Sequence, residues 1–392
     1  MASRVYVHLG LPKTATTYLQ TILWSHRELL RDQQVLVPGS ERREHYWVSR
    51  IVREDPQFAS ANRRQRGSWD RLRAEIDAWP GTALVSHEFL AAASAEQARR
   101  MVAELAPAEV HLVVTGREPL GLFTASWQES VKNRDTRPLS EYSLVEAPDS
   151  GGIWNWRTLD IGRVLQRWSS AVPAERVHVL PLPPPSAPRR EIWDRFATLV
   201  GIDPTSVDLQ QSFPNASMGV VEAETLRRVN AHLGDFHSAI DRGTYIRTYL
   251  ADERLVPRKG DPFWPAPERI EEARVRGRDA VAYIAEQGFD VVGDLASLLV
   301  PDDLPERRTP ETVTDAEVAQ VAVELVARML ADVRELRHER RDLKSLVRTL
   351  TWRTQNPPLR NALIKRFPRL SGVLEPHELL DPPPEWRIDP AK

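Results

Sequence analysis

Five short apolar runs rich in β-branched residues alternate with segments of helical character over the first half of this chain. Strands that alternate with helices form a parallel sheet covered on both faces, and ligands of such sheets bind at the carboxyl ends of the strands. We therefore predict a three-layer α/β fold with a central parallel sheet. The predicted strands are Val5–Leu9, Val35–Pro38, Ala83–Ser86, Val110–Thr115 and Arg176–Leu180. The functional site is expected in the segments that follow them: Leu9–Thr17, His87–Glu88, Gly116–Pro119 and the residues after Pro181.

The carboxyl-terminal part of the chain predicts a helical extension. A long helix is expected from about Asp315 to Thr351, with key positions at alternating spacings of three and four residues. These positions are Ala319, Ala322, Val326, Met329, Val333, Leu336, Arg340, Leu343, Val347 and Leu350. Such a heptad pattern, here broken by one arginine, is typical of a coiled coil, and a helix that packs on the domain surface is the alternative. We expect an α/β domain over 1–305, the long helix over 306–352 with a homodimer contact through 319–350, and a basic, proline-marked tail over 353–392.

Composition excludes several kinds of function. The chain has no cysteine, which rules out disulfides, thiol catalysis and cysteine-ligated zinc. Its formal net charge is −2, so there is no overall electrostatic basis for nucleic-acid binding, and any anion site must be local. No apolar run approaches the roughly 18 residues of a membrane span, and the amino terminus lacks the pattern of a signal peptide. We therefore expect a cytoplasmic protein.

The segment Val5–Gln20, VYVHLGLPKTATTYLQ, is the most specific signal in the sequence. An apolar strand leads into a tight loop with Gly10 and Pro12, and a helix opens after Lys13. Hydroxyl donors follow at Thr14, Thr16 and Thr17. The first turn of a helix presents unpaired N–H groups and the positive end of the helix dipole, which hold phosphate or sulfate. The segment therefore predicts an anion-binding loop in which Lys13 adds a mobile positive charge.

Two features argue against an ATP or GTP site. The usual triphosphate loop has the form G-x-x-x-x-G-K-[ST], whereas a proline precedes the lysine here. Strand Val110–Thr115 also ends without the acidic residue that a kinase or NTPase of that class needs for magnesium. A sulfonate donor carries less charge on the transferred group and needs no metal. The residues thus favour sulfonate transfer, with a kinase or NTPase as the weaker alternative.

The motif HxGxPKTxTTxLQ resembles the 5′-phosphosulfate loop of PAPS-dependent sulfotransferases, in particular their bacterial branch (PAPS is 3′-phosphoadenosine 5′-phosphosulfate). The resemblance covers roughly residues 1–300 and implies a P-loop-like fold that transfers a sulfonate from PAPS to a hydroxyl or amine, leaving PAP. It implies donor binding by Gly10, Pro12, Lys13, Thr14, Ala15, Thr16 and Thr17. The family usually has glycine where this chain has Ala15, so we expect a negative φ at that residue.

Members of this family carry a second element, an arginine followed eight residues later by a serine, which holds the 3′-phosphate of PAPS. Here Arg117 precedes the helix expected over Leu120–Asn133, but position 125 is alanine, flanked by Thr124 and Ser126. Either the hydroxyl has moved to Ser126 or the phosphate is held differently. Arg258, in the run RKGD, is similar to an element by which eukaryotic cytosolic members grip the same phosphate, and a solvated charge cluster is the alternative.

In-line sulfonate transfer needs a cation at the bridging oxygen of the donor and a general base for the acceptor. Lys13 is placed for the first task. His87 and Glu88 follow a strand, and in many family members the base is a histidine or glutamate at the end of this strand. We expect His87 to be the base, with Glu88 as its orienter or its rival. His8, inside the first strand, is expected to brace the packing or the loop.

The acceptor, a small molecule or a glycan, is not specified by any motif. The helix after Arg117 offers candidates for an acceptor cleft in Trp127, Gln128, Glu129 and Lys132, the alternative being helix surface and core. Trp154 and Trp156 suit stacking on a sugar or an aromatic ring, or packing in the core. An enzyme is the favoured interpretation. A non-catalytic PAP-binding scaffold that dimerises through the long helix is the alternative.

Overall fold

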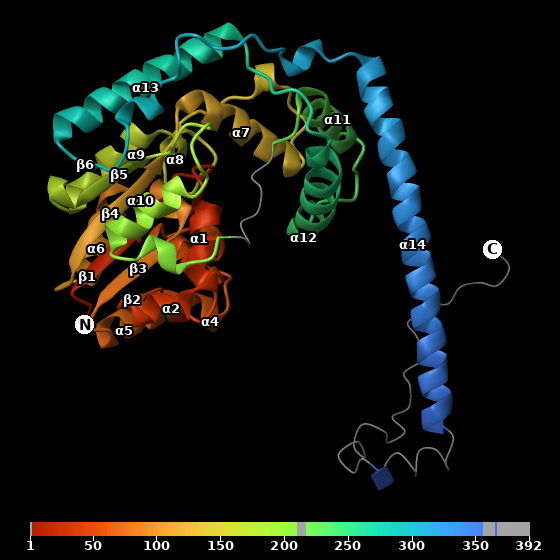
Figure 1. Ribbon diagram of the computed structural model, residues 1–392, viewed down its shortest axis with the longest axis horizontal. Coiled ribbons are helices and arrows are strands. Elements are labelled where there is room, and N and C mark those ends of the chain that lie inside the picture. The colour runs from red at the N-terminus through yellow and green to blue at the C-terminus, as the bar shows by residue number, and fades with distance from the viewer. Residues whose placement is uncertain (1, 210–216, 356–364, 367–392) are drawn as a thin grey trace. The chain divides into compact units, whose positions relative to one another are not determined.

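The computed structural model describes residues 2–209, 217–355, 365 and 366 (Figure 1). The chain divides into two compact units, Met1–Val321 and Ala322–Lys392. The division falls inside helix α14 (Asp315–Gln355), so residues 306–321, which we assigned to the helical extension, fold with the first unit. The expected tail over 353–392 lies outside the described residues except for 353–355, 365 and 366. None of the described helices is both long and apolar enough to cross a membrane.

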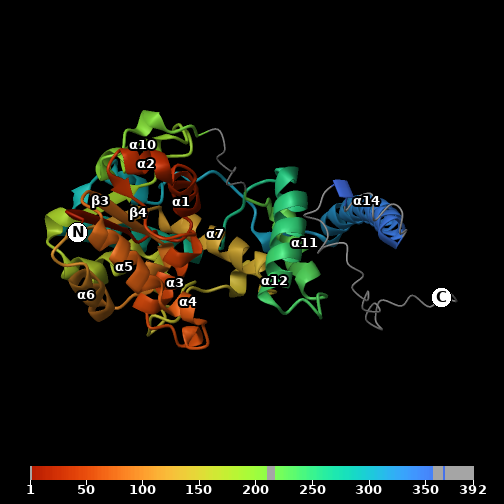
Figure 2. The same ribbon diagram turned by 90° about the horizontal axis from the view of Figure 1, so that it is seen from below.

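The first unit contains a six-stranded parallel sheet in the order β2-β3-β1-β4-β5-β6. Figure 2 labels two of its strands, β3 and β4. The strands are β1 (Arg4–His8), β2 (Val35–Leu36), β3 (Thr82–Ser86), β4 (Glu109–Gly116), β5 (Val177–Pro181) and β6 (Asp290–Val291). The first five agree with the predicted strands to within two residues. The edge strand β6 was missed because two residues are too few to give a hydrophobic pattern.

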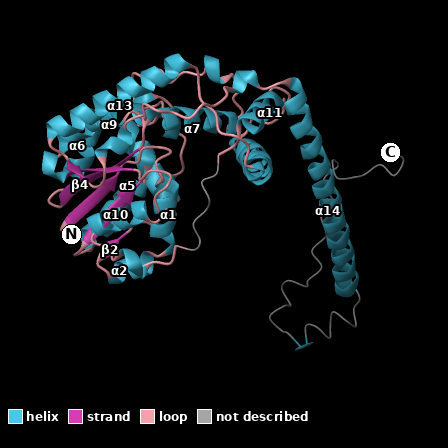
Figure 3. Cartoon of the chain, turned by 45° about the horizontal axis from the view of Figure 1, so that its top comes forward, coloured by secondary structure: helices cyan, strands magenta, loops and turns pink. Residues whose placement is uncertain are grey.

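Helices cover both faces of this sheet, as the alternation of side chains along each strand requires (Figure 3). Val5 and Val7 of β1 face one apolar core, and Tyr6 between them faces the other. The first core is completed by α3 (Arg43–Val52), α5 (Ser68–Ala78), α6 (Ala95–Glu104), α9 (Ile161–Trp168) and α13 (Pro267–Gln287). The second is completed by α1 (Thr16–Ser25), α2 (Arg27–Asp32) and α10 (Glu191–Val200). The predicted three-layer architecture is confirmed.

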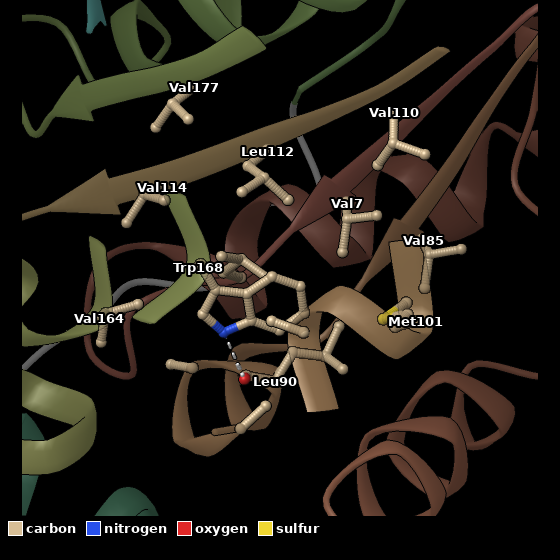
Figure 4. Packing of buried hydrophobic residues seen from close by; sticks show 14 of the residues in the cluster. Val7, Val85, Leu90, Met101, Val110, Leu112, Val114, Val164, Trp168 and Val177 are labelled. Atoms are coloured by element: carbon tan, nitrogen blue, oxygen red, sulfur yellow. Dashed lines mark hydrogen bonds between the residues drawn. The ribbon is translucent and has the colours of Figure 1, made fainter. Parts of the chain in front are cut away.

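Trp168 lies at the centre of the first core (Figure 4). Its indole packs among valines and leucines of the central strands, and its Nε1–H donates to the carbonyl oxygen of Leu90 at 3.1 Å. The polar atom of this fully buried side chain is therefore satisfied, as burial requires. Leu90 belongs to the short helix η2 (Glu88–Ala92) that follows β3, so this bond ties the core to the segment carrying His87 and Glu88.

A helical region packs on α7 (Pro119–Lys132) next to the sheet. It comprises α11 (Val220–Asn230), α12 (Ala239–Asp241), a π-helix η7 (Arg242–Leu255) and the short helix η8 (Val256–Arg258). Helical structure thus continues to Arg258, and the segment between η8 and α13 has no regular secondary structure. The side-chain amide of Asn230 anchors α11 by donating to the Val131 carbonyl oxygen at 2.7 Å.

Candidate active site

The predicted site segments meet at one edge of the sheet, because β1 lies between β3 and β4. The loop after β1 is hydrogen-bonded to β4 beyond the end of β1 itself. Leu9 and Leu11 donate their N–H groups to the carbonyl oxygens of Val113 and Thr115, both at 2.9 Å. On the other side, the N–H of His87 donates to the carbonyl oxygen of His8 at 3.1 Å. The donor-loop candidate, the His87–Glu88 pair and the segment before Arg117 therefore lie side by side.

Gly10 permits the closest approach within this site. Its φ is +89°, and a Cβ placed there would lie 2.7 Å from the Cβ of Glu88 and 2.8 Å from its Cα. Any side chain at position 10 would push these two segments apart, since real Cβ atoms do not approach so closely. The glycine thus brings the backbone of Glu88 directly against the anion loop.

The loop itself forms a concave set of backbone donors. Lys13 and Ala15 both have left-handed backbones, with φ of +65° and +63°. Left-handed residues that alternate with others turn successive N–H groups toward a common centre, the geometry of an anion nest. The N–H groups of residues 13–17 have no hydrogen-bond acceptor among the described residues. The negative φ expected at Ala15 is wrong: the alanine adopts the glycine-like conformation, and the steric cost of its methyl group is of order 1 kcal/mol.

The hydroxyl groups of the loop do not all face this nest. Thr14 is fully buried, and its Oγ1 lies 2.6 Å from both the Leu11 carbonyl oxygen and the Thr115 hydroxyl. That side chain therefore braces the loop against β4, and only its backbone is available to a ligand. Thr16 is also buried, whereas Thr17 is exposed. His8, fully buried, bridges strands in a similar way, with Nδ1 2.8 Å from the Ser86 hydroxyl.

The Lys13 ammonium is bound by a carboxylate. Its Nζ lies 2.5 Å from Glu129 Oε2 of α7, and the other oxygen of Glu129 accepts from Arg247 of the π-helix η7. Glu129 is 7 % exposed, and Lys13 is 32 % exposed. Burial by itself raises the Glu129 pKa, but Lys13 and Arg247 outweigh it and hold that pKa at about 2. Glu129, which we considered for an acceptor cleft, thus pairs with the donor-loop lysine, and sequence patterns gave no sign of Arg247.

The Glu88 carboxylate is held by side chains from two other segments. Gln20 of α1 donates from Nε2 to Glu88 Oε2 at 3.1 Å and accepts at Oε1 from Arg42 at 2.8 Å. Burial by itself raises the Glu88 pKa. The neighbouring His87 and the hydrogen bond from Gln20 lower it by more than burial raises it, so the pKa lies below its usual value. Glu88 is consequently ionised at neutral pH and free of any direct salt bridge with lysine or arginine among the described residues.

His87 differs from Glu88 in its charge and its hydrogen bonding. Its Nδ1 accepts a hydrogen bond from the Phe89 N–H at 3.1 Å, which caps η2. Burial lowers the His87 pKa to about 4, against a smaller opposing effect of Glu88. The neutral ring therefore carries its proton on Nε2, and its only basic nitrogen is already occupied. This arrangement favours Glu88 over His87 as the group that accepts a proton.

Aromatic rings surround the His87–Glu88 segment. The Phe89 ring lies 4.9 Å from that of His87 and 6.3 Å from that of Trp154, and Tyr46 lies 5.4 Å from His87. Trp154 is 39 % exposed and belongs to the loop after residue 143. Buried Arg53 holds that loop by donating from Nη1 to the Ser150 carbonyl oxygen at 2.6 Å. Tyr46 and Phe89 thus lie against the His87 ring, and Trp154 lies against Phe89.

The second nucleotide element is only partly in place. The Arg117 guanidinium is 40 % exposed and lies over Gly121 at the start of α7, where a Cβ would be 2.5 Å from its Nη2. Ser126 is buried, and its hydroxyl is bonded to that of Tyr142, so the move of the family serine to Ser126 is not supported. Thr124 lies on the partly exposed face of α7, one turn after Gly121. Arg258 donates from Nε to Glu222 of α11 at 3.0 Å. This ion pair by itself indicates neither a 3′-phosphate ligand nor a solvated charge cluster.

The remaining acceptor candidates on α7 have structural partners. Trp127 is fully buried against Phe263, and Lys132 binds Asp252 at 2.6 Å. Gln128 accepts from the Met218 N–H at 3.0 Å. Trp156 is buried as well, and its indole N–H donates to Glu272. Trp154 is therefore the candidate that keeps an exposed ring.

Comparison with known proteins gave limited similarity. No family model matches the chain, and no curated protein matches it. A sulfotransferase from Alicyclobacillus acidocaldarius, known from a crystal structure, is similar at a TM-score of 0.38 and 16 % sequence identity, over 55 % of this chain and 87 % of that one. Similarity of this size carries no conclusion about the activity of the present protein.

Proposed function

We propose that the protein transfers a sulfonate group from PAPS to a hydroxyl group of an acceptor, with Glu88 as the general base. The observation that carries this proposal is the loop of residues 13–17, whose N–H groups have no acceptor among the described residues and whose left-handed backbone at Lys13 and Ala15 suits an anion nest. Backbone donors of this kind suit the phosphosulfate end of a nucleotide. Arg117 at the end of the neighbouring strand supplies a partly exposed cation for a second phosphate.

Each step of the reaction has a residue to serve it. Glu88 removes the proton of the acceptor hydroxyl as that oxygen bonds to sulfur, and the bond between sulfur and the bridging oxygen breaks on the opposite side. The nest and Lys13 stabilise the negative charge that the 5′-phosphate of PAP acquires. Glu88 then releases its proton to solvent, so the site returns to its starting state. His87 acts as a positioning residue, since its ring caps η2 and fixes the backbone next to Glu88.

The acceptor is inferred from the rings beside the base. Phe89 and Tyr46 present planar apolar surfaces beside His87, the residue that precedes Glu88, and Trp154 lies against Phe89. A hydroxyl carried on a sugar or an aromatic ring could stack there while its oxygen faces Glu88. We propose such a ring-bearing acceptor.

The decisive experiment measures PAP binding and sulfonate transfer separately. Purified protein should bind PAP in calorimetry and transfer label from sulfur-labelled PAPS to a component of host extracts, identified by mass. Glu88→Gln should lower kcat by about 10²–10⁴-fold at unchanged PAP affinity. His87→Asn is the matched control, because its Oδ1 can replace Nδ1 as acceptor for the Phe89 N–H. That variant should lose less than about tenfold in kcat.

The outcomes separate the alternatives. Absence of PAP binding would falsify the donor assignment. Binding of PAP without transfer to any acceptor favours the scaffold protein. A Glu88→Gln enzyme with full kcat, beside an inactive His87→Asn enzyme, would return the role of base to His87.

A further inference from the structure

The second unit carries an apolar stripe whose side chains are exposed to solvent. Along α14 the side chains at six heptad positions are 40–62 % exposed, and charged residues such as Arg334, Glu335 and Arg341 lie on other faces of the helix. The six are Val326, Met329, Val333, Leu336, Leu343 and Val347. Leu330 and Leu346, which are also exposed, widen the stripe. A 41-residue helix with such a face is unusual for a single chain in water, because the apolar area gains nothing until it is buried.

The residue types along the stripe specify how many helices fit together. The first core position is β-branched in three of the four heptads between 326 and 347, namely at Val326, Val333 and Val347, and the fourth position is unbranched at Cβ, namely at Met329, Leu336 and Leu343. β-branched residues at the first position with leucine at the fourth favour two parallel helices over trimers and tetramers. A partner with the same pattern meets this face best, and the chain itself provides one.

The charges beside the stripe specify the orientation. In a parallel, in-register pair, Glu339 of one helix faces Lys344 of the second copy, and Asp332 faces Arg337 of the second copy. Both pairs are attractive, and twofold symmetry repeats each of them. An antiparallel pair would instead bring Glu339 and Asp332 together on one side and the two cations together on the other. The flanking charges therefore select the parallel arrangement.

Arg340 occupies the first core position of one heptad, between Val333 and Val347. In a parallel pair the Arg340 side chains of the two copies face each other. Glu339 of the second copy lies next to the Arg340 guanidinium of the first copy and can neutralise it. A single polar residue at this position lowers stability and fixes register, since any shift would place it against an aliphatic layer. Arg340, the polar residue in the heptad pattern, thus helps to fix the register of the two helices.

We propose that α14 forms a parallel, in-register, two-stranded coiled coil with a second copy of this chain over Val326–Val347. The inference is independent of the proposed enzymatic activity. It makes the protein a homodimer.

The oligomeric state is the first test. Light scattering on the full chain should give twice the chain mass of 44.6 kDa, and Leu336→Glu combined with Leu343→Glu should give the single-chain mass. A monomeric wild-type protein at tens of micromolar, or a dimer indifferent to both substitutions, overturns the proposal.

Orientation is tested by cross-linking, for which the absence of native cysteine is convenient. Met329→Cys and Val347→Cys should each form a disulfide with its own copy under mild oxidation. Ala331→Cys, on the outer face of the helix, is the matched control and should not. Cross-linking only in a mixture of the Met329→Cys and Val347→Cys proteins would show an antiparallel pair and refute the parallel one.

Exchanging the charges of residues 339 and 344 distinguishes loss of the ion pairs between the two copies from a general destabilisation of the helix. Glu339→Lys should weaken dimerisation by about five- to tenfold in Kd, because two ion pairs become repulsive. The double variant Glu339→Lys, Lys344→Glu should recover part of the lost affinity, because the pairs between positions 339 and 344 are restored whereas a lysine at position 339 cannot neutralise Arg340. A double variant no tighter than the single one contradicts the proposed pairing.

Discussion

Replacement of Glu129 by glutamine should increase the affinity of the protein for PAP. In the structure the Glu129 carboxylate holds the Lys13 ammonium at 2.5 Å, and in the proposed function the bound nucleotide uses that same ammonium. Binding must therefore break or share this ion pair. Arg247 also binds Glu129, so the carboxylate keeps one cation when Lys13 leaves.

The size of the effect follows from the surroundings of the pair. A hydrogen bond between charged groups contributes about 1.5–3 kcal/mol, and Lys13 is 32 % exposed, so water replaces part of what it loses. The lower figure, about 1.5 kcal/mol, corresponds to about a tenfold change in Kd. Calorimetric titration with PAP should thus give a Kd about tenfold lower for Glu129→Gln than for wild type.

The same substitution should change stability in the opposite direction. Ionised Glu129 has a pKa of about 2, below the model-peptide value of 4.5, so its pairing contributes at most about 3 kcal/mol at neutral pH. Because the folded pKa is depressed, this contribution is present above pH 4.5 and is lost as the pH falls toward 2. Glu129→Gln should be less stable at pH 7, and its denaturant midpoint should depend less on pH in that window.

A double-mutant cycle identifies the cause. Glu129→Gln should not tighten PAP binding in a Lys13→Ala background, because no ammonium is left to release. An equal or weaker PAP affinity of the single variant, or the same gain with and without Lys13, would refute the competition between Glu129 and nucleotide.

Two further substitutions test other parts of the site. Ala15→Gly should raise the free energy of unfolding by about 0.5–1 kcal/mol, because glycine relieves the strain at φ +63°; chemical denaturation measures it, and a loss of stability contradicts the strained loop. Trp154→Ala should raise KM for the acceptor by about tenfold through lost stacking, with kcat and PAP affinity nearly unchanged. An unchanged acceptor KM would remove this ring from the acceptor site.

The parts of the site that follow strands could be predicted, because a parallel sheet brings all its carboxyl ends to one edge. The positions of Gly10, His87, Glu88 and Arg117 follow from this rule. The bonding state of each side chain could not be predicted in the same way. Ser126 was a plausible nucleotide ligand by spacing, but a tyrosine sixteen residues away occupies its hydroxyl.

The sequence by itself determined the layered α/β fold, the tight loop between the first strand and α1, and the long helix α14, because each depends on patterns local to the chain: alternation, turn residues and helical period. Only the tertiary structure decided that Glu129 and Arg247 control Lys13, that Gln20 and Arg42 hold Glu88, and that the proton of His87 lies on Nε2. These contacts join residues from 22 to 118 positions apart, or depend on one backbone N–H at 3.1 Å. Sequence periodicity does not predict such tertiary contacts, because they depend on how whole layers pack and on which buried charged groups need partners.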